Sequence, residues 1–167
     1  MRFIYLDPPY PHQARKHYKM PEVDHAVMIA EATRDYDGFA LSTSSSALQE
    51  VLAICPAYVR IAAWVKPFCS FKPGVNPAYA WEPVIFHTPR RRARDAPTIR
   101  DWHSENITLR TGLSGAKPES FCYWIFELLG LEKCDELEDK FPGTGAVGAA
   151  YRKWQSMGLD RWAEAVG

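Results

Sequence analysis

Two consecutive prolines near the start of the chain determine where its first strand must end. Arg2 to Leu6 is a short apolar run rich in aromatic and branched residues, which predicts a buried strand. Pro8 and Pro9 follow Asp7, and a proline has no N–H to donate to a sheet ladder. The chain must therefore leave the sheet directly after Asp7. This places an acid, a rigid turn and the ring of Tyr10 at the carboxyl end of a strand, where open α/β sheets bind ligands.

The Asp7 to Tyr10 turn has the groups needed for methyl transfer to an exocyclic amine. The lone pair of an adenine N6 amine is delocalised into the ring, so this nitrogen is a poor nucleophile. The Asp7 carboxylate and the Pro8 carbonyl can accept both N–H bonds, which aims the nitrogen lone pair at a sulfonium methyl. Tyr10 can stack on a base flipped out of its helix. The alternative is an ordinary turn after a strand, because Asp and Pro are common turn residues.

The remainder of the chain alternates between strand-like and helix-like patterns. Apolar, β-rich runs predict strands at 39–43, 58–65, 82–87 and 134–141. Helical spacing and breakers predict helices that begin near residues 21, 46, 118 and 146. In the first of these helices, Val23, Val27 and Ala30 form the apolar stripe, with acids in the first turn. The alternation predicts one α/β domain over residues 1–167, with a parallel sheet of about five strands.

Composition limits which classes of protein and which partners fit this sequence. An apolar fraction of 47% in 167 residues is enough for one buried core. No apolar run could span a membrane, and no signal-peptide pattern opens the chain. The four cysteines lack Cys-x-x-Cys spacing and companion histidines, so we predict reduced thiols in a cytoplasmic protein and no metal site. The net charge of zero means that any contact with nucleic acid needs a local basic patch.

Two segments and one strand end supply basic or aromatic side chains for such a patch. Residues 11–20 form a polar, basic and aromatic segment, and residues 89–110 carry six arginines with little periodicity. Clustered arginines favour phosphate contact, driven by counterion release, while a solvated surface loop is the alternative for each segment. The predicted nucleic-acid contacts are His17, Tyr18, Lys66, Arg90, Arg91, Arg92 and Arg94.

A second strand-end turn follows the last predicted strand. Residues 139–145 read Asp-Lys-Phe-Pro-Gly-Thr-Gly, and a glycine-rich turn between a strand and a helix lets the backbone approach a ligand closely. One such turn is a weak signal. Two turns of this kind in one small domain must face the same crevice, so together they predict a shared site.

Five motifs, taken in order, resemble a known family. They are Asp7-Pro8-Pro9-Tyr10, His17-Tyr18-x-Met20, Trp64-Val65-Lys66, Lys117-Pro118 and the Phe-Pro-Gly-Thr-Gly turn at 141–145. Together they are similar to the adenine-N6 amino methyltransferases related to the eukaryotic mRNA adenosine methylase, a family with DNA-modifying bacterial and phage relatives. The resemblance covers nearly the whole chain. In this family the catalytic motif precedes the cofactor turn, and this chain has the same permuted order.

The resemblance implies a Rossmann-like methyltransferase fold, with a minimal, mostly parallel sheet flanked by helices, and S-adenosylmethionine as the cofactor. Asp7 and Pro8 would hold the target amine, and Tyr10 would stack on the base. Lys117 would bind the cofactor carboxylate at a helix N-terminus, unless it is a solvated lysine, and Asp139 would pair with the cofactor ammonium. The implied catalytic residues are Asp7, Pro8, Pro9 and Tyr10. The implied cofactor-binding residues are Lys117, Pro118, Asp139, Phe141, Pro142, Gly143, Thr144 and Gly145.

The chain departs from the family pattern after the glycine-rich turn. Permuted relatives usually add a strand that ends in an acid for the cofactor ribose, whereas only Asp160 and Glu164 follow here, outside any strand pattern. We therefore expect the ribose contact to come from elsewhere, such as a homodimer or a partner chain that completes the cofactor site.

Three functions compete for this sequence. The favoured one is adenine-N6 methylation of nucleic acid, with DNA favoured over RNA and the choice left open by the sequence, in the bacterial nucleoid or the phage-infected cytoplasm. The alternative is a weak or inactive methyltransferase-like subunit that binds nucleic acid or a partner enzyme. A different α/β nucleotide-binding enzyme is disfavoured, because the chain has no Gly-x-x-x-x-Gly-Lys loop.

Overall fold

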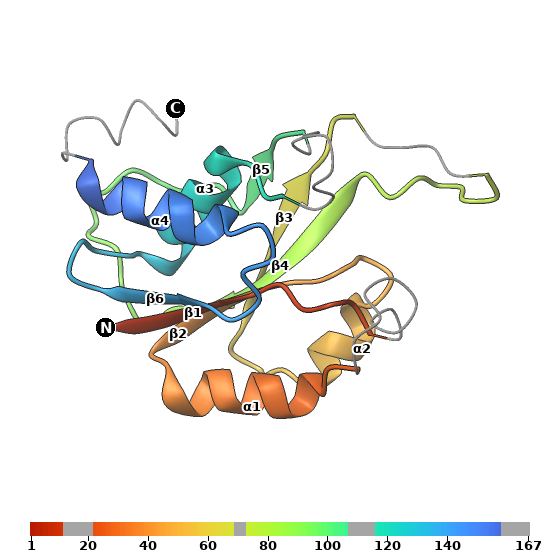
Figure 1. Ribbon diagram of the computed structural model, residues 1–167, viewed down its shortest axis with the longest axis horizontal. Coiled ribbons are helices and arrows are strands. Elements are labelled where there is room, and N and C mark those ends of the chain that lie inside the picture. The colour runs from red at the N-terminus through yellow and green to blue at the C-terminus, as the bar shows by residue number, and fades with distance from the viewer. Residues whose placement is uncertain (12–21, 69–72, 107–115, 158–167) are drawn as a thin grey trace.

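The computed structural model describes residues 1–11, 22–68, 73–106 and 116–157 (Figure 1). Within them, six strands form one sheet in the order β5-β3-β4-β2-β1-β6. The strands are β1 (Arg2–Leu6), β2 (Gly38–Ser42), β3 (Arg60–Val65), β4 (Trp81–His87), β5 (Trp102–Ser104) and β6 (Glu136–Asp139). The helices are α1 (His25–Asp35), α2 (Leu48–Ala53), α3 (Glu119–Leu129) and α4 (Ala146–Ser156). Each of these helices is shorter or more polar than a membrane-spanning helix.

Five of the six described strands point the same way, and β4 runs antiparallel to its neighbours β2 and β3. The prediction of a mostly parallel sheet is confirmed, while β4 departs from the parallel order expected from the alternation. The reason lies in the β3–β4 connection, where Pro67, Pro73, Gly74 and Pro77 interrupt any helical pattern. The described residues of this connection form no crossover helix, and β4 returns beside β3 as its antiparallel partner.

The sheet also has one strand more than the five expected. β5 lies within the arginine-rich stretch 89–110 and pairs in parallel with β3, with Trp102 opposite Ala63 and Ser104 opposite Val65. Three residues are too few for an alternating pattern to appear in the sequence. Pairing with β3, and not local propensity, therefore defines this strand.

The first helix starts later than predicted, and its buried face is different. Asp24 is the N-cap residue, and its side chain accepts a hydrogen bond from the backbone N–H of Val27 at 3.0 Å. The buried residues are Met28, Ile29 and Ala32, whereas Val27 is 52% exposed. The predicted stripe of Val23, Val27 and Ala30 and the acidic first turn were wrong. The cap at Asp24 leaves Glu22 and Val23 outside the helix, and the sheet packs against the face with the larger side chains of Met28 and Ile29.

The core has two layers, one on each face of the sheet. In Figure 1, α1 and α2 lie on one side of the sheet and α3 and α4 on the other. Strand β1 contributes to both layers: Phe3 and Tyr5 face α3 and α4, while Ile4 and Leu6 face α1 and α2. All four side chains are at most 1% exposed, and each stabilises the fold by about 1.5–3 kcal/mol. Burial on both faces thus fixes the position of Asp7, which follows directly.

Candidate active site

One edge of the sheet collects polar side chains, and we call it the carboxyl edge because the parallel strands end there. Asp7, Thr43, Lys66 and Glu105 directly follow β1, β2, β3 and β5, and Asp139 is the last residue of β6. Glu82 lies near the start of the antiparallel strand β4, which places it at the same edge. Behind this edge, the central strands β1 and β2 are mostly apolar and buried, so their first polar side chains come at the position where α/β sheets bind ligands.

Four charged side chains form a continuous network at the carboxyl edge, which we call the four-charge cluster. The Nζ atom of Lys117 lies 3.1 Å from Oδ1 of Asp7 and 3.7 Å from Oε2 of Glu82. The second carboxylate oxygen of Glu82, Oε1, accepts a hydrogen bond from Lys66. Two ammonium groups thus balance two carboxylates, and both ammonium groups lie near the ring of Trp64, at 4.5 Å for Lys66 and 5.2 Å for Lys117.

The two lysines of the cluster respond differently to burial. Burial lowers the pKa of Lys117, but the charges of Asp7 and Glu82 outweigh this effect and raise the pKa above its ordinary value. Lys117 is therefore an ammonium ion at neutral pH. Burial dominates for Lys66, so its pKa is lowered in spite of the hydrogen bond with Glu82.

The glycine-rich turn is held beside the first turn by strand pairing. β6 pairs with β1 in parallel, with Asp139 opposite Tyr5, and the backbone N–H of Lys140 donates to the carbonyl of Tyr5 at 3.1 Å. Gly143 and Gly145 have φ angles of +44° and +74°, a conformation that side chains other than glycine rarely adopt. A Cβ atom on Gly145 would meet nothing within 4 Å, so the backbone at the start of α4 borders open space.

Three buried polar atoms at the carboxyl edge have no hydrogen-bond partner among the described residues. They are Oγ1 of Thr43, Oδ1 of Asp139 and Oε2 of Glu82, although the last still lies 3.7 Å from the Lys117 ammonium group. A buried polar atom without a partner costs about 1–3 kcal/mol. Burial also raises the pKa of Asp139, and the charge of Asp7 adds to this effect. Unsatisfied polar atoms gathered at one edge are what a polar ligand would satisfy.

The structure brings some predicted site residues together. Lys66 and Lys117 both join Asp7 in the four-charge cluster, although Lys117 was predicted to bind a cofactor carboxylate. Pro118 is the N-cap residue of α3, and Tyr10 closes the described part of its turn, half-buried. His17 and Tyr18 lie outside the described residues.

Arg90 lies at the opposite end of the strands, which we call the amino edge. Its Nη1 donates to Oδ2 of Asp135 and to the carbonyl of Gly130, both at 2.6 Å, and its Nη2 donates to Oδ1 of Asp135 at 3.1 Å. Burial raises the pKa of Asp135, but hydrogen bonds from Arg90, the amino group of Met1 and the backbone N–H of Glu132 outweigh it and hold the pKa at about 2. Arg90 is thus engaged in the fold.

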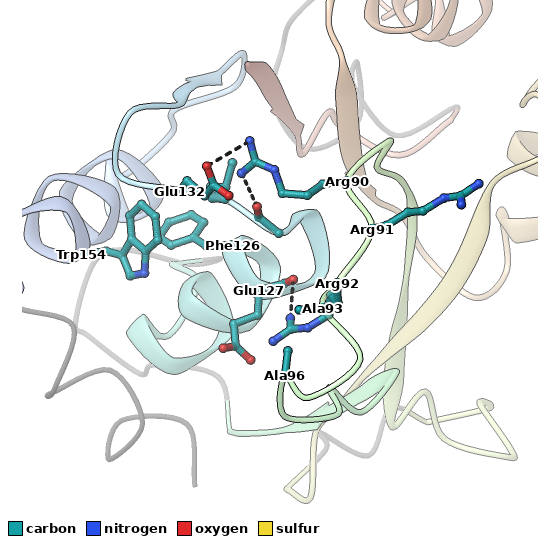
Figure 2. Close-up of a pocket in the computed structure, with 11 residues that line it drawn as sticks. Arg90, Arg91, Arg92, Ala93, Ala96, Phe126, Glu127, Glu132 and Trp154 are labelled. Atoms are coloured by element: carbon teal, nitrogen blue, oxygen red, sulfur yellow. Dashed lines mark hydrogen bonds and ion pairs between the residues drawn. The ribbon is translucent and has the colours of Figure 1, made fainter.

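The other three predicted arginines also follow β4 at the amino edge, away from Asp7. Nη1 of Arg92 lies 3.4 Å from the carbonyl oxygen of Glu127. Figure 2 shows Arg91 extending away from Arg90 and Arg92. The structure therefore does not bring these arginines to the carboxyl edge, and their contact with phosphate stays a prediction.

Two members of the site were missed from the sequence. Glu82 was treated only as the first residue of a strand, and Thr43 only as the last residue of another. The available signal for Glu82 was an acid next to an apolar β-rich run, where a charge needs a partner. Thr43 carried no signal, because Thr is common in strands.

Comparisons with known proteins identify the fold. No protein-family model and no curated protein matches the sequence. Among solved structures, the chain is similar to the crystal structure of the M1.HpyAVI–SAM complex, with 16% identity and a TM-score of 0.62 over 98% of this chain and 86% of that chain. It is also similar to the crystal structure of M1.HpyAVI, with 11% identity and a TM-score of 0.60 over 99% of this chain and 84% of that chain. The six-stranded, mostly parallel sheet with helices on both faces is thus a methyltransferase fold.

Proposed function

We propose that this chain is an S-adenosylmethionine-dependent methyltransferase that acts on the N6 amine of adenine in DNA. The observation that carries the proposal is the adjacency of two ligand-binding turns at the carboxyl edge. The Asp7 to Tyr10 turn follows β1, the glycine-rich turn follows β6, and these strands pair directly, with Tyr5 opposite Asp139. The similarity to the M1.HpyAVI–SAM complex and the order of the sequence motifs support the same chemistry.

The residues around the glycine-rich turn fit the cofactor. Oδ1 of Asp139 is buried without a partner among the described residues, and it can accept a hydrogen bond from the cofactor ammonium. Gly143 and Gly145 have the positive φ angles that favour glycine, and because glycine has no side chain, a ligand can approach the backbone at the N-terminus of α4 closely. When bound, S-adenosylmethionine supplies an electrophilic sulfonium methyl group.

The Asp7 turn fits the target amine. Lys117 holds Oδ1 of Asp7, which leaves Oδ2 to accept one N–H bond of an exocyclic amine. The carbonyl of Pro8 accepts the other N–H bond from a backbone whose φ is fixed by the proline ring. Tyr10 stacks on the flipped base. The chain itself thus orients the nitrogen lone pair, and the charge of Lys117 keeps the Asp7 carboxylate in place.

A labelled-methyl assay with a conservative variant tests this proposal. Purified protein is incubated with labelled S-adenosylmethionine and adenine-containing DNA, and the modified base is identified by mass spectrometry. Asp7→Asn keeps the shape of the side chain but replaces the acceptor oxygen with a donor. We expect transfer to adenine N6 by the wild type and a loss of at least about 100-fold in the variant, as for other groups that stabilise a transition state.

The control is Asp95→Asn, an exposed acid in the loop after β4, which should keep the wild-type rate. Cofactor affinity, measured by calorimetry, should be unchanged in both variants. Absence of cofactor binding by the wild type, or equal transfer by wild type and Asp7→Asn, would overturn the proposal. A parallel assay on RNA of the same sequence should give less transfer than DNA.

A further inference from the structure

A cavity of about 580 Å³ lies at the amino edge, a volume within the range of about 300–1,000 Å³ that is usual for small-molecule sites. It opens where Arg60 of β3 pairs with Phe86 of β4, and its other walls come from the segment after β4 and from the end of α3. The five residues of β1, at about 3.3 Å each, separate the amino edge from the carboxyl edge by about 17 Å. We call this cavity the arginine cavity.

Three arginines line this cavity without an acid partner. Arg60, Arg92 and Arg94 all contribute to its wall, and none of them forms an ion pair within the part of the chain that the structure describes. Arg90 differs, because Asp135 neutralises it. In Figure 2, Arg90 is directed toward Glu132 and the Gly130 carbonyl, whereas the guanidinium of Arg92 lies at the backbone carbonyl of Glu127.

The acids that line the cavity do not cancel these charges. Asp101 and Glu127 belong to the wall, so three unpaired arginines face two carboxylates. The chain as a whole carries no net charge, which makes this local positive excess distinct. Arginine, with its planar fork of donors, is suited to phosphate recognition.

The same cavity offers aromatic surface. Tyr58 is 55% exposed and packs on His87, with ring centroids 4.5 Å apart. The guanidinium of Arg60 lies 5.5 Å from the ring of Phe86. An exposed ring close to guanidinium groups is the combination that stacks a nucleobase while holding its phosphate.

We propose that the arginine cavity binds a nucleoside phosphate, with the phosphate on Arg92 and Arg94 and the base against Tyr58. The ligand is a free nucleotide or one nucleotide of a single strand, since both present the same chemistry. This site is separate from the carboxyl edge, and it does not require that the proposed methyl transfer takes place there.

Calorimetry with uridine monophosphate tests the proposal. This probe lacks the adenine amine, so it does not report on the Asp7 turn. The wild type should bind uridine monophosphate more tightly than inorganic phosphate or uridine, because inorganic phosphate lacks the nucleoside and uridine lacks the phosphate. The double variant Arg92→Ala/Arg94→Ala should weaken binding at least about tenfold, and Tyr58→Ala should weaken it by a comparable factor.

Arg91→Ala is the matched control, because Arg91 is a neighbouring arginine that does not line this cavity. It should bind the probe like the wild type, and so should Asp7→Asn, whatever its effect on methyl transfer. If a short oligouridylate binds more tightly than uridine monophosphate, the natural ligand is a single strand. If uridine monophosphate binds more tightly, the natural ligand is a free nucleotide. Equal binding of inorganic phosphate, absence of binding by both nucleotide probes, or equal weakening by Arg91→Ala would overturn the proposal.

Discussion

The ammonium group of Lys117 lies 3.1 Å from the carboxylate of Asp7, so a residue predicted to bind the cofactor touches the residue predicted to hold the substrate. The Lys117 side chain is 9% exposed and that of Asp7 is 26% exposed. Glu82 completes the arrangement at 3.7 Å from the same Nζ atom. One lysine thus bridges two carboxylates that would otherwise repel each other.

We therefore expect Lys117→Met to destabilise the fold. The substitution keeps an apolar stem of similar length but leaves Asp7 and Glu82 without their shared cation. Removing one partner of a buried pair costs about 3–5 kcal/mol, and the lower end applies here because Asp7 is 26% exposed. Urea unfolding followed by circular dichroism measures the change. Lys153→Met is the control, because the Lys153–Glu119 pair is about half exposed and should cost less than about 1 kcal/mol. Equal stability of the two variants would remove Lys117 from any structural role in the site.

Acid stability should depend on Asp135. Its pKa in the folded protein is about 2, below the ordinary value of 3.8, so the unfolded state binds protons more readily. Ionised Asp135 contributes about 2 kcal/mol to the free energy of unfolding. This contribution is fully present above pH 3.8 and is lost as the pH falls through 2. Urea unfolding of the wild type at pH 6, 4 and 2.5 should show most of this loss below pH 4.

The variant Asp135→Asn checks the origin of that pH dependence. It should be less stable than the wild type at pH 6, because Arg90 loses its carboxylate, and it should lose less further stability between pH 4 and 2.5. Asp95→Asn, which changes an exposed acid, should follow the wild-type curve. An identical pH profile for Asp135→Asn and the wild type would contradict the low pKa.

The features that the sequence predicted correctly depend on local rules. β1 and its end at Leu6 follow from an apolar run stopped by two prolines, and both need only neighbouring residues. The mostly parallel sheet follows from the alternation of strands and helices. The glycine-rich turn between β6 and α4 was likewise predicted from residues that stand next to each other.

The features that were missed depend on strand order, which no local pattern encodes. Glu82 meets Lys66 and Lys117 because β4 inserts between β3 and β2 in the opposite direction. β5 exists because β3 offers it an edge. The direction of β4 likewise carries the arginine segment to the amino edge, although its predicted contact with phosphate stays a prediction. Long-range pairing decided each of these outcomes.

Gly143→Val should weaken cofactor binding by at least about tenfold. A branched side chain disfavours the φ angle of +44° and would project into the turn that we propose for the cofactor. Calorimetry with S-adenosylmethionine measures the change, and DNA affinity should be unaffected. Gly74→Val is the control: Gly74 also has a positive φ, and nothing lies within 4 Å of a Cβ atom there. An equal loss of cofactor affinity in both variants would assign the effect to backbone strain in general.

The last prediction concerns Arg91, Arg92 and Arg94, the predicted phosphate contacts that form no ion pair with Asp135. If Arg91, Arg92 and Arg94 contact DNA phosphates, the triple alanine variant should bind all DNA sequences more weakly, because phosphate contacts carry no sequence information. The slope of log affinity against log salt should fall by about 0.9 per lost contact. Arg90→Ala should instead destabilise the fold, since its guanidinium is held by Asp135. The measurement is DNA affinity at several salt concentrations. If the plots of log affinity against log salt coincide for the wild type and the triple variant, these three arginines do not contact phosphate and other parts of the chain must do so.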